Sequence, residues 1–192
     1  MANHVSSHLQ FVNISEEGRK IVEDIGNVLR TRNGDNEHSP SLGFAFTENI
    51  DDLTRTFMCD YVGAKWAYLD DWENDYMSFE SAWSPVEEFV EYVVGEVAKV
   101  DESVIAKYTY EDEMPNFFGV QIYTKDGLHD AEEMDSEELL ENLFDSNPDL
   151  KEEYSEDDGF TDKGHDILWE VQWGFINDWQ EKTAREMMDF DE

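Results

Sequence analysis

Four carboxylates within six residues form the first group in the sequence that could do chemistry. They are Asp70, Asp71, Glu73 and Asp75. Paired carboxylates can serve as general acid and base, or can hold a divalent cation. Aspartate and asparagine also favour turns, and this group stands between two strand-like runs. We therefore expect a solvated hairpin loop here, and neither a catalytic site nor a metal site.

A second group of acids imitates a calcium-binding loop. Asp145, Asn147, Asp149 and Glu156 stand where such a loop has its first, third, fifth and twelfth positions. Leu150 occupies the sixth position, where the loop needs a glycine, and no clear helix follows. We expect no metal ion and no cofactor.

The histidines and the single cysteine give no stronger candidate. His4 and His8 share one face of a predicted strand, but four residues apart they are too distant for easy shared metal binding. Cys59 lies in an apolar helical pattern without an adjacent histidine, which predicts a buried core thiol. Because the sequence also lacks a phosphate-binding glycine loop, a nucleophile elbow and a zinc pattern, we do not expect an enzyme.

The charge of the chain is its most unusual property. Its 192 residues include 48 acidic and 13 basic ones, for a formal net charge of −35. Such a charge disfavours direct binding to nucleic acid or to an anionic membrane and favours a basic partner. The acids are concentrated, since residues 126–158 hold 15 acidic residues and, as a base, only Lys151.

This concentration supplies the candidate partner-binding residues. They are Glu132, Glu133, Asp135, Glu137, Glu138, Glu141, Glu152, Glu153, Glu156, Asp157 and Asp158. The four hairpin acids named above form a second candidate location. For any single acid, plain solvent exposure is the more common role.

The elements that would position these acids follow from periodicity. Residues 64–94 predict two antiparallel strands and a helix, with Ser84 as N-cap and Pro85 as the first helical residue. A strand over residues 4–13 and a helix beginning at Ser15 precede this unit. Residues 51–62 predict a helix capped by Asn49, and residues 104–122 predict another hairpin.

Apolar residues in these elements predict one interface between sheet and helix. Its expected members are Trp66, Phe79, Trp83, Phe89, Val93, Tyr108, Phe118 and Val120. Residues 136–144 predict a short helix, and residues 164–188 predict a long one whose apolar face must be covered. That face comprises Leu168, Trp169, Val171, Phe175, Ile176 and Trp179.

Four segments carry a family resemblance: MANHVSSHLQF, GAKWAYLDDW, SFESAWSP and YEDEMPNFFGVQIY. They resemble the YubB-like, ferredoxin-like family of phages and plasmids, over roughly residues 1–125. The chain departs from the family pattern in the loop of residues 33–50, at Val86, where a second proline is common, and after Gly127. The resemblance implies an antiparallel sheet with helices on one face, and it implies no active-site residue.

The expected fold class is therefore α+β, a ferredoxin-like antiparallel sheet with helices on one face plus an acidic helical C-terminal extension. We place the domain at residues 1–126 and the extension, packed on it, at residues 127–192. A single cysteine cannot form an internal disulfide, and the sequence shows no signal peptide and no membrane-spanning run. These features favour the cytoplasm.

Three classes of function stay open. The first is a phage-type protein that imitates nucleic acid and so inhibits a basic, nucleic-acid-handling host or defence protein. The second is an antitoxin-like inhibitor of a defence toxin that binds through the shape of an aromatic patch. The third is a housekeeping protein whose acids serve only solvation, which the uneven distribution of charge disfavours. The oligomeric state does not follow from the sequence.

Overall fold

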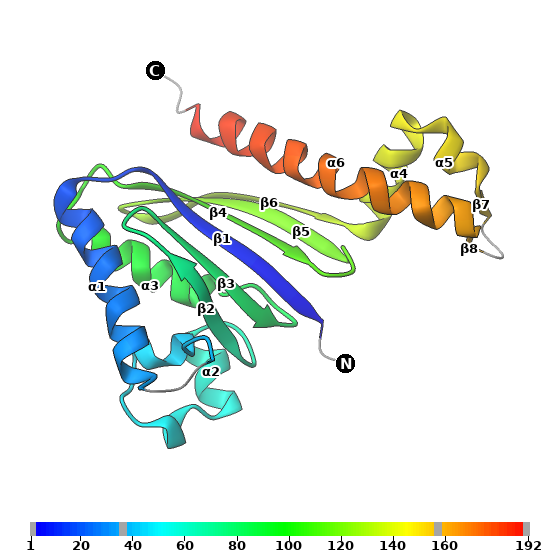
Figure 1. The fold of residues 1–192 in the computed structure, drawn as a ribbon. Coiled ribbons are helices and arrows are strands. Elements are labelled where there is room, and N and C mark those ends of the chain that lie inside the picture. Colours follow the sequence, from blue (N-terminus) through cyan, green and yellow to red (C-terminus); the bar gives the residue numbers. More distant parts are fainter. Residues whose placement is uncertain (1–2, 35–37, 156–158, 190–192) are drawn as a thin grey trace.

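The computed structural model describes residues 3–34, 38–155 and 159–189 (Figure 1). The strands are β1 (His4–Asn13), β2 (Ala67–Trp72), β3 (Tyr76–Ala82), β4 (Ile105–Asp112), β5 (Phe117–Thr124), β6 (Gly127–Asp135), β7 (Tyr154–Ser155) and β8 (Gly159–Phe160). The α-helices are α1 (Glu16–Arg32), α2 (Arg55–Tyr61), α3 (Glu87–Ala98), α4 (Ser136–Ser146), α5 (Pro148–Glu152) and α6 (Asp162–Met188). Two short 3-10 helices are η1 (Leu42–Ala45) and η2 (Ile50–Asp52).

The main sheet has six antiparallel strands in the order β2-β3-β1-β4-β5-β6. The first four strands, with α1 after β1 and α3 after β3, reproduce the ferredoxin-like order, and the expected α+β class is confirmed. β5 and β6 extend the sheet on the β4 side. We expected no strand after Gly127, yet β6 lies beyond residue 126 and is the sixth strand of the same sheet. The division of the chain into a domain and an extension at residue 126 stays a prediction.

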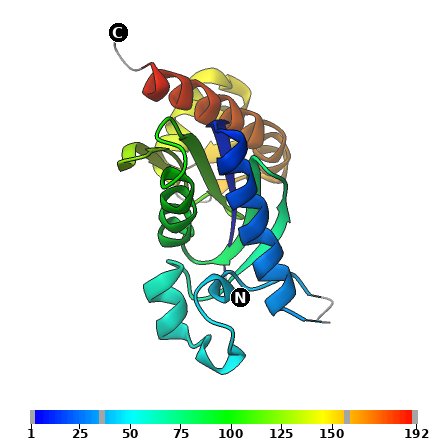
Figure 2. The ribbon, with the colours of Figure 1, turned by 90° about the vertical axis from the view of Figure 1, so that its left-hand side faces the viewer.

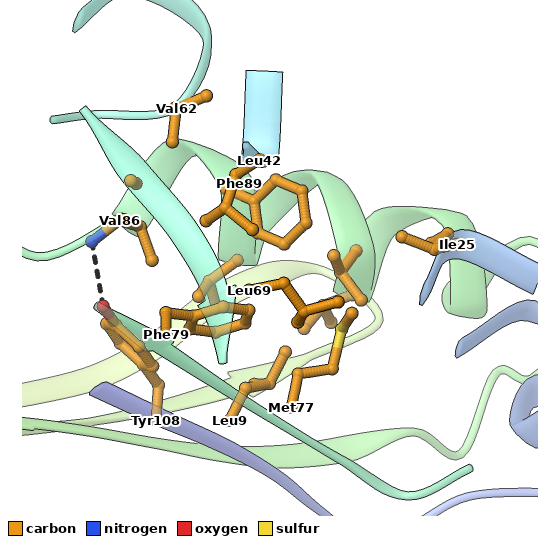
Figure 3. Close-up of a cluster of buried hydrophobic side chains, with 14 of the residues drawn as sticks. Leu9, Ile25, Leu42, Val62, Leu69, Met77, Phe79, Val86, Phe89 and Tyr108 are labelled. Atoms are coloured by element: carbon orange, nitrogen blue, oxygen red, sulfur yellow. Dashed lines mark hydrogen bonds between the residues drawn. The ribbon is translucent and has the colours of Figure 1, made fainter. Parts of the chain in front are cut away.

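One face of the sheet is covered by α1 and α3, which lie side by side in Figure 2. The N-cap of α1 is Ser15, as expected, since its side chain accepts a hydrogen bond from the Gly18 amide. α1 and α3 bury apolar residues against the inward side chains of β1 to β4. Figure 3 shows this core around Phe89 and Phe79, whose rings meet edge to face with centroids 5.5 Å apart.

The start of α3 differs from the expected one. The helix begins at Glu87, and Ser84 is not its cap, because the Ser84 hydroxyl donates instead to the Gly63 carbonyl at 2.8 Å. The amide of Val86 donates to the buried hydroxyl of Tyr108 at 2.9 Å (Figure 3), so a strand residue satisfies a donor at this helix end.

The opposite face of the sheet is covered in part by α6. In β5 the side chains of Phe118, Val120 and Ile122 point toward α6, and the Phe118 and Trp179 rings meet at 5.2 Å. The expectation that Phe118 and Val120 belong to the same interface as Phe89 is therefore wrong, although both are fully buried. The alternation of side chains along a strand sends them to the other face.

Two tryptophans expected in the core lie closer to solvent. Trp66 is half-buried, and Trp83 is 53% exposed. Trp83 follows the last residue of β3 with a φ of 74°, the left-handed region, and the turn directs its side chain outward. Cys59, expected in the core, is exposed on α2.

The segment between α1 and β2 also departs from expectation. In place of one helix over residues 51–62 there are η2, capped by the Asn49 side chain, and α2, capped by Thr54. Gly63 follows with a φ of 94°, a conformation that favours glycine and ends the helical stretch. No helix in the described part of the chain combines the length and the apolar composition needed to cross a bilayer.

Candidate partner-binding surface

The acids of β6 divide between the two faces of the sheet. Glu132 pairs with Val120 and so lies on the α6 side, whereas Glu133 pairs with Gly119 and lies on the α1 and α3 side. From Leu128 to Glu133 every residue of this edge strand is exposed. The two neighbouring glutamates thus cannot belong to one flat lattice of charges.

Glu133 has a structural partner. The hydroxyl of Tyr110 in β4 donates to its carboxylate at 2.9 Å, across the intervening strand β5. This crossing is possible because residue 119 of β5 is glycine, where a Cβ would overlap the Tyr110 ring and lie 3.0 Å from the Glu132 carbonyl oxygen. Burial, reinforced by the hydrogen bond to Glu133, raises the pKa of the Tyr110 phenol.

The helix α4 presents the clearest row of free carboxylates. Asp135 is its N-cap and accepts from the amides of Glu137 and Glu138 at 2.9 and 3.0 Å. Leu139 and Leu143 are buried. Glu137, Glu138 and Glu141 are exposed, and their side-chain carboxylates make no hydrogen bond or ion pair among the described residues.

The acids near α5 differ from one another. Glu152 is exposed and makes no hydrogen bond or ion pair among the described residues, although its charge contributes to the raised pKa of Lys163. Glu153 is paired, since the Lys163 ammonium lies 2.6 Å from its carboxylate, and this hydrogen bond holds the pKa of Glu153 below its ordinary value. Glu156, Asp157 and Asp158 lie outside the described residues.

The hairpin acids lie at the opposite edge of the sheet, because β2 and β6 are its two outer strands. Asp70 and Asp71 belong to β2 and not to a loop, with a bulge between Leu69 and Asp71. Asp71 accepts from the Tyr76 hydroxyl, which raises the pKa of Tyr76 to about 12. Asp75 pairs with Arg19 at 2.8 Å.

These positions separate the predicted acids into groups. The helices α4 and α5 lie at the end of the molecule where β7, β8 and the start of α6 also lie (Figure 1). The hairpin acids are remote from them, and half of those acids are engaged within the fold. Glu132, Glu137, Glu138, Glu141 and Glu152 hence form the exposed, unpaired set, which we call the acidic surface.

A polar cleft of about 490 Å³ between β4 and α6 was not anticipated from the sequence. Glu111 lines it, and burial raises the pKa of the Glu111 carboxyl. His8 lines the cleft from β1. Burial lowers the pKa of its imidazole, whereas the negative charge of Asp70 acts to raise it. Lys107 crosses the cleft to Glu181 at 2.5 Å. Only strand register, which places these groups on one face with α6 above, could have revealed this cleft.

Within residues 3–34, 38–155 and 159–189 no three histidine, cysteine, aspartate or glutamate side chains lie close enough together to hold a metal ion. No protein-family model matches the sequence, and no curated protein matches it significantly.

Proposed function

We propose that this chain is a non-enzymatic protein that binds and inhibits a basic, nucleic-acid-handling protein by offering carboxylates in place of phosphates. The partner belongs to a host cell or to its defence, and the complex forms in the host cytoplasm, as the resemblance to YubB-like proteins of phages and plasmids suggests. The observation that carries the proposal is the acidic surface, whose carboxylates are exposed and make no hydrogen bond or ion pair among the described residues.

The arrangement of α4 supports this proposal. Glu137 and Glu141 are four residues apart and Glu138 and Glu141 three, which places their Cβ atoms about 5–6 Å from one another. Like charges at these spacings destabilise a helix by roughly 0.2–0.5 kcal/mol per pair. A protein that only needed solubility could disperse these charges, whereas a bound cationic surface would turn the repulsion into attraction.

The total charge suits the same role. Duplex DNA carries one negative charge per ~1.7 Å of axis, so that a net charge of −35 corresponds to roughly 17 base pairs. The long-range field of such a protein speeds encounter with a basic cleft. Carboxylates cannot be cleaved or modified as a phosphodiester can, so the partner would be occupied without turnover.

The decisive experiment begins with affinity purification from expressing cells and identification of the bound proteins. The purified complex is then challenged with duplex DNA and with increasing salt. For a nucleic-acid mimic we expect DNA to displace the protein and affinity to fall steeply with salt, because both ligands compete for the same basic groups.

A five-fold variant locates the interaction. Replacement of Glu132, Glu137, Glu138, Glu141 and Glu152 by Gln should slow association and weaken the complex while the fold persists. The matched control removes five exposed charges elsewhere, by Glu23→Gln, Asp24→Asn, Glu91→Gln, Glu102→Gln and Glu113→Gln. A complex that resists DNA and is weakened equally by both sets would reject mimicry by the acidic surface and favour an inhibitor that binds by shape.

A further inference from the structure

A pocket of about 570 Å³ opens beside β2, at the part of the sheet that α6 does not cover. Trp66 and Tyr68 form one wall, with ring centroids 5.6 Å apart. Leu53 and Met58 supply an apolar lining from the segment before β2. This pocket lies at the opposite edge of the sheet from the acidic surface.

The aromatic wall is held in place and yet accessible. The ring of His4 meets Trp66 edge to face, with centroids 5.2 Å apart. Tyr68 lies in β2, and the outer edge of this strand is occupied by residues 40 and 41. Ser41 forms a β-bridge with Tyr68, and the Leu69 amide donates a hydrogen bond to the Pro40 carbonyl. Tyr68 remains 39% exposed. A preformed aromatic surface of this kind binds with little loss of side-chain entropy.

A carboxylate stands next to the aromatic wall. Glu80 lies directly opposite Tyr68 in the β2 and β3 register, so the two side chains leave the same face with Cβ atoms about 4.5–5.5 Å apart. The side chain of Glu80 is 51% exposed and binds the ring nitrogen of His4. Lys65 also lines the pocket and is exposed.

We propose that this pocket receives an arginine side chain of the basic partner. Aromatic faces attract a guanidinium, which can stack on them while it donates to a carboxylate such as Glu80. The apolar lining would hold the methylene stem of the arginine. The net charge of −35 concentrates cations around the protein, and it opposes an anionic occupant such as a nucleotide.

The inference rests on the proposed function for the basic nature of the partner, but it assigns a separate contact. The acidic surface would guide encounter through long-range attraction, and the pocket would anchor the complex through a short-range contact. An arginine is favoured over a lysine because its planar guanidinium stacks on an aromatic ring and can donate two hydrogen bonds to one carboxylate.

The probe is the peptide acetyl-Gly-Arg-Gly-amide, titrated into the full chain at moderate salt. The readout is the indole N–H resonance of Trp66, compared with that of Trp169, which is 65% exposed on α6, far from the pocket. We expect saturable movement of the Trp66 resonance alone. The same peptide with citrulline, a neutral isostere of arginine, should bind at least about five-fold more weakly.

Variants test the wall and the carboxylate separately. Trp66→Leu and Tyr68→Leu should each lower affinity about two- to five-fold, with the other indole and backbone resonances as readout. Glu80→Gln should weaken binding, whereas Glu152→Gln, which removes an equal charge elsewhere, should not. Unchanged dispersion of the remaining resonances confirms that each variant is folded.

Equal binding of the citrulline peptide, or equal movement of the Trp66 and Trp169 resonances, would overturn the proposal. Failure here differs from failure of the proposed function. The peptide assay needs no partner and leaves the acidic surface intact, while the five-fold glutamine variant leaves the pocket intact. If the chain binds the arginine peptide but does not compete with DNA, the arginine pocket is supported and nucleic-acid mimicry is rejected.

Discussion

The side chain of Gln180 in α6 donates to the carbonyl oxygen of Tyr110 in β4, at 3.1 Å. The same amide nitrogen also lies 3.1 Å from the carbonyl of Gly119 in β5, the register partner of Tyr110. Gln180 is 5% exposed, so these bonds are shielded from water. A buried amide thus fixes the position of α6 over two strands, in addition to the apolar contacts around it.

Loss of this amide should loosen α6. Gln180→Ala removes the two bonds and the packing of the side chain, and we expect a loss of about 1–3 kcal/mol in the free energy of unfolding. Urea denaturation followed by tryptophan fluorescence measures it. Glu170→Ala, at an exposed position of the same helix, controls for helix propensity and should change stability by less. Equal losses for the two variants would show that the buried bonds contribute little.

The core on the other face depends on Phe89. Phe89→Ala should destabilise the protein by about 3–5 kcal/mol, because the side chain is fully buried and its removal leaves a cavity against Phe79. Thermal and urea unfolding measure this loss. Trp169→Ala removes a larger but 65% exposed side chain and should cost about 0.5 kcal/mol or less. A Phe89 variant as stable as the parent would contradict the packing described for α3.

Replacement of two glycines by alanine should change the stability of the protein in opposite directions. Gly119→Ala places a methyl group against the Tyr110 ring and should destabilise by about 1–3 kcal/mol. Gly174→Ala lies in the middle of α6 with open space around it and should stabilise by up to about 1 kcal/mol. Melting temperatures of the two variants compared with the parent test both signs. A Gly119 variant with an unchanged melting temperature would show that the Tyr110 ring moves freely.

The carboxyl of Glu111 should make stability depend on pH. Its folded-state pKa is raised above the ordinary value of 4.5 by burial, with the Gln180 side chain opposing the shift. As the pH rises from below 4.5 through the raised value, the unfolded chain ionises first, so stability is lost across this window and is not regained above it. Glu111→Gln should hence be more stable than the parent at neutral pH.

The advantage of the Glu111 variant should disappear below pH 4.5, where the carboxyl is protonated in both states. Urea denaturation at several pH values tests this convergence. Glu113→Gln, an exposed neighbour, removes the same charge without burial and separates the local effect from general repulsion in an acidic protein. Identical pH profiles for the two variants would show that Glu111 is not desolvated in the fold.

The elements with strong local patterns could be predicted from the sequence. β1 matches its expected range, since Val5, Ser7, Leu9 and Phe11 alternate with polar, outward residues. Ser15 caps α1, as its position before two glutamates suggested. β6 was missed because Leu128 to Glu133 carry no apolar alternation, and the strand exists through main-chain pairing with β5. Long-range pairing of this kind leaves little trace in local composition.

The candidate site was predictable in composition but not in geometry. The run of acids from Glu132 to Glu141 was evident, whereas the separation of Glu133 from Glu132 required the register between β5 and β6. The engagement of Asp71 with Tyr76 and of Asp75 with Arg19 likewise arises from contacts distant in the chain or across a turn. The pocket at Trp66 depends on a segment before β2 that the sequence suggested only as a loop and a helix.

The position of α6 over β5 has a consequence for biosynthesis. Phe118, Val120 and Ile122 emerge from the ribosome well before the helix that covers them, and at roughly 5–20 residues per second this interval lasts several seconds. During it, one apolar stripe of the nascent sheet faces solvent. The residues made in that interval are β6, α4 and α5, the most acidic part of the described chain, whose charge would repel neighbouring nascent chains and keep the unfinished fold from aggregating.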